Sequence, residues 1–328
     1  MSFAMYRSPG GVIFLDDDPD YLEMLAEVMP LDWYVRLFVR PVACIELLLK
    51  EPPLWEADAW AQQEIVNRWR EGAMLIPQIL AYWREDGTTR FELTKVCVVD
   101  YSMPAMSGLR VLSELDGWSG ARVLLTGRTD EQLAVSAFNR HLIEQFVPKQ
   151  SPELRVRLTE TIINLLRLPN ARREQIWRAT LTREQHDLLC RPDIAQSLEQ
   201  LSLKHGWIEY VVIGAPFGVL ALNQKANVNW VQLEPAENLK ELAEMAESQG
   251  WAVQTVEDIR AGKKLIDLEL QLALGGADKP QPMQAIALGE APVLLYGALF
   301  QVNQIFCPDP QASHERFLSS REERKLQD

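Results

Sequence analysis

The chain has 328 residues, of which 47% are apolar and 24% are charged, and its formal net charge is −13. This length exceeds what one hydrophobic core usually serves, so we expect two domains. The acidic balance argues against a large nucleic-acid footprint, and no apolar run approaches the roughly 20 residues of a membrane span. Four widely spaced cysteines indicate a cytoplasmic location and neither a zinc site nor a disulfide framework: Cys44, Cys97, Cys190 and Cys307.

The first half of the chain alternates short apolar strands with helices. Val12–Leu15 is an apolar run that ends in three aspartates, after which Pro19 begins a helix. The same pattern predicts four further strands, at Val35–Val39, Val96–Val99, Arg122–Leu125 and Gln145–Val147. Helices are expected between them and at the end, at 42–49, 108–115, 131–138 and 152–168, the last with Ser151 as its N-cap. Five such strands predict a doubly wound α/β fold, with a parallel sheet covered on both faces.

Polar residues occur where these strands end. Asp16 and Asp17 follow the first strand, Asp100 ends the third, Thr126 ends the fourth, and Lys149 follows the fifth. Because the carboxyl ends of parallel strands meet at one edge of a sheet, we expect these side chains to lie together. Three adjacent carboxylates resist ionisation unless a cation lies among them, and an all-oxygen pocket suits Mg²⁺. An aspartate beside Mg²⁺, with a lysine and a hydroxyl in reach, is equipped to attack a phosphoryl group.

The stretches LDDDP, VVDYSMPAMSG, VLLTG and FVPK occur in this order along the chain. Together they resemble the signature of receiver domains from the response regulators of bacterial two-component signalling. The resemblance covers roughly Val12 to Leu168 and implies a flavodoxin-like, phosphorylated receiver domain over residues 1–168. It departs from the family pattern after Lys149, where Gln150 stands in place of the usual proline.

The resemblance also implies a role for each matching position. It makes Asp100 the phosphoacceptor, Asp17 a direct Mg²⁺ ligand and Asp16 a ligand mostly through water. It gives Ser102 a backbone carbonyl on the metal, and it places Thr126 and Lys149 on the phosphoryl oxygens. Phe146 is then the aromatic residue that changes rotamer together with Thr126 on activation. Phosphorylation and its hydrolysis are the only catalysis implied, and the implied donor is a sensor histidine kinase or a phosphotransfer protein.

The interval between Asp17 and Asp100 is far longer than the roughly 45 residues that its helices and strands require. We therefore expect a helical insertion at about 50–94, which contains Trp55, Trp60, Trp69 and Trp83. These tryptophans either form a small core within the insertion or provide a docking surface for the second domain or another subunit.

The second half predicts a linker helix at 169–184 and an α+β output domain at 185–328. A meander is expected at Tyr210–Ile213, Gly218–Leu222 and Val228–Leu233, and later strands at Ala285–Leu288 and Val293–Phe300. Helices are expected at Glu237–Ser248, Val256–Leu274 and His314–Lys325. No motif of a known output enzyme is present.

Three kinds of output remain open on the sequence alone, and one of them is an enzyme without a recognised motif. Acidic residues outnumber basic ones after Ala171, which favours a domain that binds a protein or a small ligand. Such a domain could also form a homodimer. The alternative is nucleic-acid binding, as in a transcriptional regulator. Its candidate residues are basic and lie in two stretches, Arg172, Arg173, Arg178 and Arg183 in the first and Arg260, Lys263 and Lys264 in the second.

Overall fold

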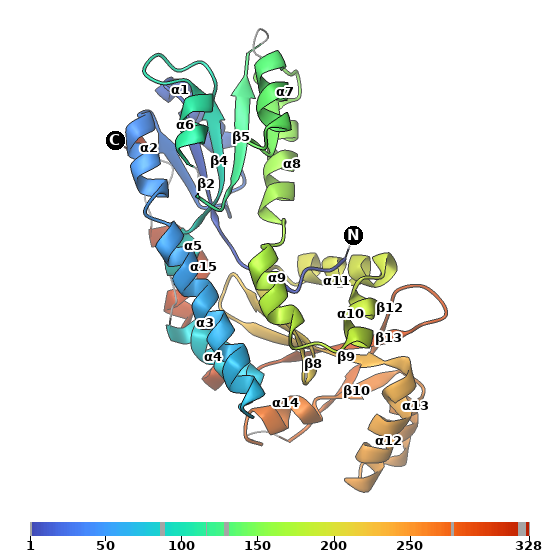
Figure 1. Cartoon of the computed structure of the whole chain (residues 1–328). Helices are drawn as coiled ribbons and strands as arrows, with labels where there is room; N and C mark the ends of the chain where they lie inside the picture. Colours follow the sequence, from blue (N-terminus) through green and yellow to red (C-terminus); the bar gives the residue numbers. More distant parts are fainter. Residues whose placement is uncertain are drawn as a thin grey trace. The chain divides into compact units, whose positions relative to one another are not determined.

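The computed structural model describes residues 2–85, 89–115, 117–127, 131–276, 279–320 and 326–327. They form two compact units, each built from separate stretches of the chain (Figure 1). The parallel-sheet unit comprises Pro9–Asp58, Thr88–Leu168 and His314–Asp328. The antiparallel-sheet unit comprises Met1–Ser8, Ala59–Gly87 and Pro169–Ser313. No helix of the described residues is long and apolar enough to cross a membrane.

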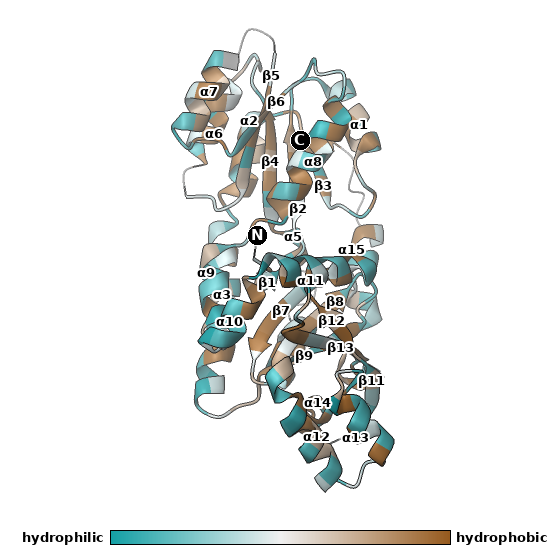
Figure 2. Cartoon of the chain, turned by 90° about the vertical axis from the view of Figure 1, so that its right-hand side faces the viewer, coloured by the Kyte–Doolittle hydropathy of each residue, from teal (hydrophilic) through white to brown (hydrophobic). Residues whose placement is uncertain are grey.

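The parallel-sheet unit has the strand order β14-β3-β2-β4-β5-β6, and every neighbouring pair is parallel. The strands are β2 (Gly11–Leu15), β3 (Val35–Phe38), β4 (Thr94–Asp100), β5 (Ala121–Thr126), β6 (Gln145–Pro148) and β14 (Leu326–Gln327). The inner strand β2 is buried at every position and β4 at every position except Lys95, because both faces of the sheet are covered, and Figure 2 shows the inner strands largely in brown. The predicted five-stranded parallel fold is therefore confirmed.

Helices cover the two faces of this sheet. On one face, Ile13 and Leu15 of β2 belong to a core that also contains the apolar sides of α2 (Pro41–Leu48), α6 (Gly108–Glu114) and α7 (Glu131–Asn139). On the other face, Val12 and Phe14 belong to a core with α1 (Pro19–Val28) and α8 (Leu154–Leu166). The helix α8 begins after Glu153, which makes no side-chain cap, so the predicted N-cap at Ser151 is wrong.

The C-terminal end of the chain completes this unit, which the sequence pattern did not predict. Strand β14 pairs in parallel with the edge strand β3, and so adds a sixth strand to the sheet. The helix α15 (His314–Ser320) packs through Phe317 against Tyr34, with ring centroids 5.0 Å apart. His314 contacts the ring of Phe91 in α5 (Thr89–Glu92), and burial lowers its pKa to about 4. The predicted helix over 314–325 is shorter in the structure, and its residues 321–325 lie outside the described part.

The antiparallel-sheet unit has the strand order β1-β7-β8-β9-β13-β12. Its strands are β1 (Tyr6–Arg7), β7 (Trp207–Gly214), β8 (Phe217–Asn223), β9 (Val228–Pro235), β12 (Ile286–Leu288) and β13 (Leu295–Gln301). The predicted meander corresponds to β7, β8 and β9, and the predicted α+β class is confirmed. The N-terminal strand β1 pairs with β7 at the edge, where Phe3 stacks on Tyr210 at 4.9 Å between ring centroids.

The helices of this unit are α4 (Leu75–Glu85), α9 (Ala171–Arg178), α10 (Arg183–Leu189), α11 (Pro192–Lys204), α12 (Leu239–Ser248), α13 (Val253–Arg260) and α14 (Leu268–Ala273). The helix expected over Val256–Leu274 is wrong, because the chain turns at Gly262, where φ is +66°, and forms β10 (Lys264–Ile266) before α14. Strand β10 pairs with β11 (Pro282–Gln284) in a separate two-stranded sheet.

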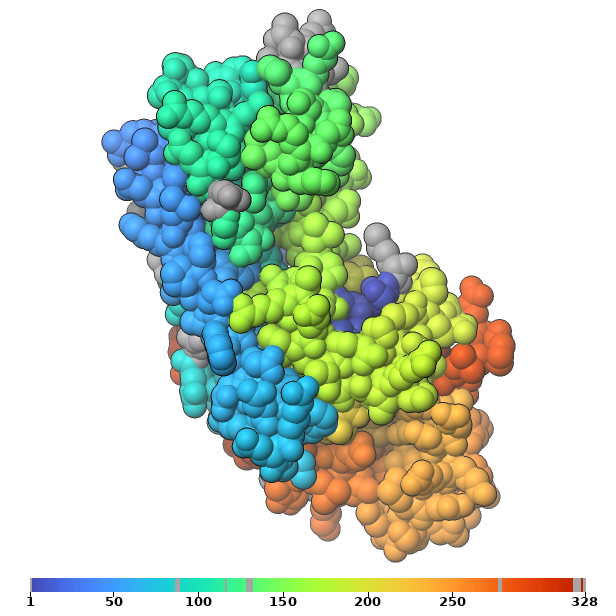
Figure 3. All heavy atoms as spheres, in the orientation of Figure 1, coloured from blue at the N-terminus to red at the C-terminus, as the bar shows by residue number. Residues whose placement is uncertain are grey.

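The helical insertion is present as α3 (Pro52–Arg70), α4 and α5. Residues 59–83 share one hydrophobic core with the antiparallel sheet, to which Trp83 contributes a completely buried ring and Trp69 a partly buried one. In Figure 3 the light-blue surface of α4 lies beside the orange surface of α14, in agreement with the contacts between these helices. The insertion therefore has no separate core for these two tryptophans, whereas Trp60 is 62% exposed.

The compact units divide the chain differently from the expected domains 1–168 and 185–328. Pro169 does mark a change of unit, but the first eight residues and the middle of the insertion belong with the second half. The expected linker helix is also part of this unit, because Ile176 and Trp177 of α9 are buried in its core. The physical reason is that apolar residues far apart in the chain complete the same core, which local composition does not reveal.

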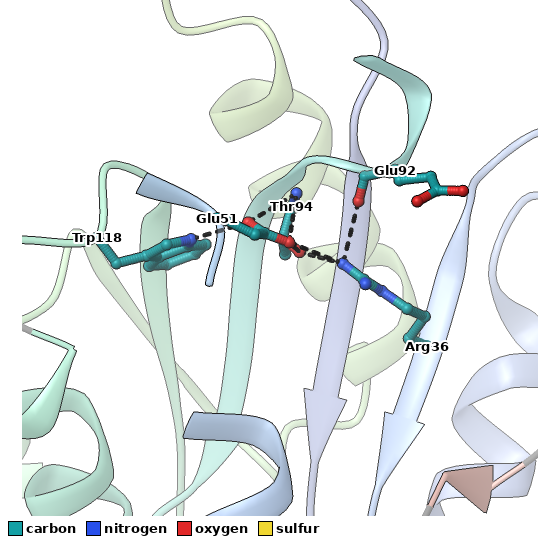
Figure 4. Close-up of polar contacts among 5 residues, drawn as sticks. All are labelled: Arg36, Glu51, Glu92, Thr94 and Trp118. Carbon is teal, nitrogen blue, oxygen red and sulfur yellow. Dashed lines mark hydrogen bonds and ion pairs between the residues drawn. The ribbon is translucent and has the colours of Figure 1, made fainter. Parts of the chain in front are cut away.

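A buried polar network lies at the amino end of β4, where the insertion begins (Figure 4). Both carboxylate oxygens of Glu51 accept hydrogen bonds from the amide of Thr94, each at 3.1 Å. The Trp118 indole donates to Glu51 at 3.1 Å, and the Arg36 guanidinium donates at 3.2 Å. Arg36 also donates to the Thr94 hydroxyl and to the Glu92 carbonyl. Glu51, whose carbonyl accepts from the first amides of α3, thereby fixes the start of this helix to the sheet.

Candidate functional site

Three carboxylates meet at the carboxyl edge of the parallel sheet. Asp16 and Asp17 directly follow β2, and Asp100 is the last residue of the neighbouring strand β4. One oxygen from each of the three lies within 4.8 Å of the others. Asp16 and Asp100 are 2% and 5% exposed, whereas Asp17 is exposed. The structure thus brings together the three aspartates that we expected at this edge.

Lys149, directly after β6, extends its ammonium group into this cluster. Its Nζ lies 2.6 Å from Oδ2 of Asp16 and 2.8 Å from Oδ1 of Asp100. Burial alone would lower the pKa of Lys149, but the hydrogen bonds to Asp100 and Asp16 outweigh burial and raise it. The backbone amide of Lys149 donates to the Thr126 carbonyl at 2.9 Å, which places the residue although Gln150 replaces the usual proline. Lys149 therefore remains a cation shared between two carboxylates.

The ionised form of Asp16 is destabilised in this arrangement. Its pKa is raised because burial disfavours the carboxylate, and the negative charge of Asp100 adds to the rise. The hydrogen bond from Lys149 acts in the opposite direction without cancelling the rise. Three carboxylates and one ammonium leave an excess of negative charge in a pocket lined with oxygen ligands, which is the donor chemistry that Mg²⁺ prefers.

The third aspartate of the sequence DDDP, Asp18, has a structural role. The amide of Asp18 donates to Oδ1 of Asp16 at 3.1 Å, and Oδ1 of Asp18 accepts from the amides of Asp20 at 3.0 Å and Tyr21 at 3.2 Å. Asp18 is therefore the N-cap of α1, with Pro19 in the first turn. These consecutive hydrogen bonds fix the loop that carries Asp16 and Asp17.

The loop after Asp100 closes tightly on the strand. The amide of Ser102 donates to Oδ2 of Asp100 at 3.0 Å, and the amide of Gly108 donates to the Tyr101 carbonyl at 3.0 Å. A Cβ atom at Gly108 would lie 2.2 Å from the Asp100 carbonyl oxygen. Glycine is thus required where α6 begins, because any side chain there would push the helix away from Asp100.

Thr126 and Phe146 occupy neighbouring strands. Thr126 is completely buried, and its hydroxyl has no hydrogen-bond partner among the described residues. Phe146 pairs with Leu124, two positions before Thr126, so Thr126 and Phe146 lie on the same face of the sheet. An unpartnered buried hydroxyl is uncommon in proteins, and this one lies at the same sheet edge as the three aspartates.

Tyr21 is a residue of this site that the sequence analysis missed. The Lys149 ammonium lies 4.4 Å from the centroid of the Tyr21 ring. Burial raises the pKa of Tyr21 to about 12, so its hydroxyl stays protonated. The signal in the sequence was the capped first turn of α1, which places the third helical residue beside the preceding aspartates.

Four of the seven basic residues considered for nucleic acid are buried or face carboxylates. Arg173 is buried over the ring of Tyr6, and Arg183 faces Asp187 on its own helix at 3.7 Å. In the second stretch, Lys264 lies on β10 and pairs with Asp258 at 2.9 Å, whereas Arg260 faces Glu247 at 3.9 Å. The helix α13 ends at Arg260, so Lys263 and Lys264 lie outside it.

Comparisons with known proteins address the fold of the whole chain. No protein-family model and no curated protein matches the sequence. Among solved structures, the Legionella pneumophila response regulator LqsR aligns over 99% of this chain and 99% of its own, with 19% identity and a TM-score of 0.69. A response regulator receiver domain from Clostridium thermocellum covers 48% of this chain and 94% of its own, with 16% identity and a TM-score of 0.30. The chain therefore has the fold of a full-length response regulator, with a receiver-type parallel sheet and a second, antiparallel sheet.

Proposed function

We propose that this protein is a response regulator in which Asp100 accepts a phosphoryl group and thereby changes the activity of the antiparallel-sheet unit. One observation supports this proposal above the others. Asp16, Asp17 and Asp100 converge at the carboxyl edge of a parallel sheet, with the Lys149 ammonium within 3 Å of two of them. A lone ion pair at a strand end would serve stability, whereas an excess of carboxylates calls for a bound cation.

The donor set fits Mg²⁺. Asp17 would be a direct ligand, Asp16 would act mostly through water, and Asp100 and the Ser102 carbonyl would complete the protein ligands. When bound, Mg²⁺ compensates the excess negative charge and polarises the phosphoryl oxygens. The exposure of Asp17 leaves the site open to solvent, and so accessible to the ion and to a phosphodonor.

The residues of the chain would perform the transfer as follows. An oxygen of the Asp100 carboxylate attacks phosphorus, and the bond to the nitrogen of the donor phosphohistidine breaks, with its electron pair retained by that nitrogen. The Lys149 ammonium and the Thr126 hydroxyl bind the oxygens of the transferring group. Later, water attacks phosphorus and the bond to Asp100 breaks, which releases inorganic phosphate and a proton. Thr126 and Phe146 would change position with phosphorylation and alter the neighbouring surface.

The proposal implies partners of two kinds. A sensor histidine kinase or a phosphotransfer protein would supply the phosphoryl group in the cytoplasm. The antiparallel-sheet unit would bind a protein or a small ligand, or a second copy of the chain. Arg173 is buried and Lys264 is paired with Asp258, which favours such a partner over nucleic acid.

The first experiment is phosphorylation of the full-length chain by acetyl phosphate with Mg²⁺, followed by intact-protein mass spectrometry. We expect one added phosphoryl group on the wild type and on the control Asp187→Asn, which alters an exposed aspartate far from β4 in sequence. Asp100→Asn should gain none, and chelation of Mg²⁺ should prevent the reaction. Equal labelling of Asp100→Asn would remove Asp100 from its role.

The output is tested by capture of partners from a lysate with and without beryllofluoride and Mg²⁺. A protein that binds in one state only supports a phosphorylation-controlled binding unit. Recovery of nucleic acid that is lost at high salt would instead favour a nucleic-acid-binding output.

A further inference from the structure

Among the described residues, the Lys149 ammonium contacts two carboxylates and one aromatic ring. The ring is that of Tyr21, whose centroid lies 4.4 Å from Nζ. A cation at this distance is attracted to the electron-rich face of an aromatic ring. The four-carbon side chain of a lysine is flexible, and that of Lys149 is 25% exposed, so its rotamer depends on the groups that contact the ammonium. The ring therefore supplies a constraint that the two carboxylates do not.

The position of Tyr21 is itself fixed by the site loop. Its amide donates to Oδ1 of Asp18 at 3.2 Å, and the amide of Asp18 donates to Oδ1 of Asp16 at 3.1 Å. The same loop thus sets one carboxylate that contacts Lys149 and the ring that contacts it from another direction. Any displacement of this loop would move the Asp16 carboxylate and the Tyr21 ring together.

The hydroxyl of Tyr21 does not account for the presence of this residue. It is buried and has no hydrogen-bond partner among the described residues, which ordinarily costs stability. Packing alone would be served by leucine, which has no hydroxyl to bury and no aromatic ring. Through its side chain, Tyr21 contacts the site by the approach of its ring to the Lys149 ammonium.

We propose that Tyr21 is a positioning residue for the phosphoryl transfer, whose ring holds the Lys149 ammonium in the orientation needed to meet the phosphoryl oxygens. This inference rests on the proposed function of Asp100. It extends that function to a residue on α1 that provides no ligand and no nucleophile.

The test compares two substitutions in the full-length chain. Tyr21→Leu removes the ring, and Tyr21→Phe keeps it while removing the hydroxyl. With acetyl phosphate and saturating Mg²⁺, we expect Tyr21→Leu to lower the phosphorylation rate about 5- to 30-fold. Tyr21→Phe should stay within about twofold of the wild type and unfold at the same or a higher temperature, because it no longer buries an unpaired hydroxyl. Tyr21→Met, another variant without a ring, replaces Tyr21→Leu if the latter does not fold.

A double-mutant cycle with Lys149 separates positioning from a general structural effect. In a Lys149→Met background, loss of the ring should change the remaining rate by less than about twofold, because the residue on which Tyr21 acts is already absent. The same fold-loss in both backgrounds would overturn the proposal, since Tyr21 would then act independently of Lys149.

The outcomes also distinguish this inference from the proposed function. A wild type that accepts no phosphoryl group overturns both. A wild type that does accept it, with a Tyr21→Leu variant that reacts at the same rate, overturns the role of Tyr21 alone. A Tyr21→Phe variant as slow as Tyr21→Leu would show that the ring is not the functional part.

Discussion

Strand β4 has an ion-pair cluster at each end, and the two clusters differ in charge balance and in exposure. At the amino end, Arg36 and Glu51 balance one another, and their side chains are only 7% and 6% exposed. At the carboxyl end, Lys149 pairs with two of three clustered carboxylates, and the third, Asp17, is exposed to solvent. Both oxygens of Glu51 are occupied by donors of the chain, whereas the other cluster keeps unbalanced negative charge. On the proposed function, the amino-end cluster stabilises the fold and the carboxyl-end cluster binds a cation.

The largest expected effect comes from removal of the carboxylate at the amino end. Glu51→Ala leaves the Arg36 charge buried without its partner, so we expect the free energy of unfolding to fall by about 3–5 kcal/mol. Urea denaturation followed by circular dichroism measures this change.

The matched variant at the other end of the strand is Asp100→Asn. It removes a negative charge from a cluster that has an excess, so in the absence of Mg²⁺ its unfolding free energy should not fall. Equal destabilisation by the two variants would contradict the division between a stabilising and a binding cluster.

A smaller effect is expected for the indole that donates to Glu51. Trp118→Phe keeps an aromatic ring but removes the hydrogen bond to a carboxylate, which should cost about 1.5–3 kcal/mol. The control is Trp177→Phe, which removes a hydrogen bond of 2.9 Å to the neutral Gln62 and should cost about 0.5–1.5 kcal/mol. Both values are measured by chemical denaturation. A larger loss for Trp177→Phe would contradict the stronger hydrogen bond expected between Trp118 and the Glu51 carboxylate.

Gly108→Ala tests how closely the carboxyl-end site depends on its backbone. The new Cβ would overlap the Asp100 carbonyl, so the strand end or α6 must shift, at a cost of about 1–3 kcal/mol. Phosphorylation by acetyl phosphate should slow as well, because Asp100 moves with its carbonyl. In the control Gly10→Ala, the added Cβ meets only the flexible Lys95 side chain within 3 Å, so both stability and the phosphorylation rate should change less.

The two clusters also differ in how far they could be predicted. Asp16, Asp17, Asp100 and Lys149 each follow an apolar strand, and parallel strands bring their ends to one edge regardless of what lies between them. The residues of the amino-end network have no such signal: Arg36, Glu51, Thr94 and Trp118 come from separate elements, and each is ordinary in its local sequence.

The same reasoning explains the errors in the fold. The helix α15 and the strand β14 belong to a unit whose other strands end at residue 148, and no periodicity in the chain predicts a pairing over that distance. The helix expected over Val256–Leu274 followed an apolar pattern, but Gly262 adopts a positive φ and turns the chain into a short strand. Apolar runs as short as these do not distinguish a helix from a strand, and the turn between them decides the structure.

The smallest expected effect is the pH dependence that the carboxyl-end cluster adds to stability. Since the pKa of Asp16 is raised by burial, the folded chain holds this proton at a pH where the unfolded chain has lost it. Its contribution to stability is therefore complete below the ordinary pKa of an aspartate, 3.8, and is lost as the pH rises through the raised value in the folded chain. Without Mg²⁺, Asp16→Asn should make the free energy of unfolding decline less steeply over this interval, as measured by urea denaturation at a series of pH values. Mg²⁺ should reverse the trend for the wild type, because the ion binds the ionised carboxylates and stabilises the folded chain more as the pH rises. A pH dependence that neither Asp16→Asn nor Mg²⁺ alters would mean that the charge excess at this edge is compensated within the chain, as it is at the other end of β4.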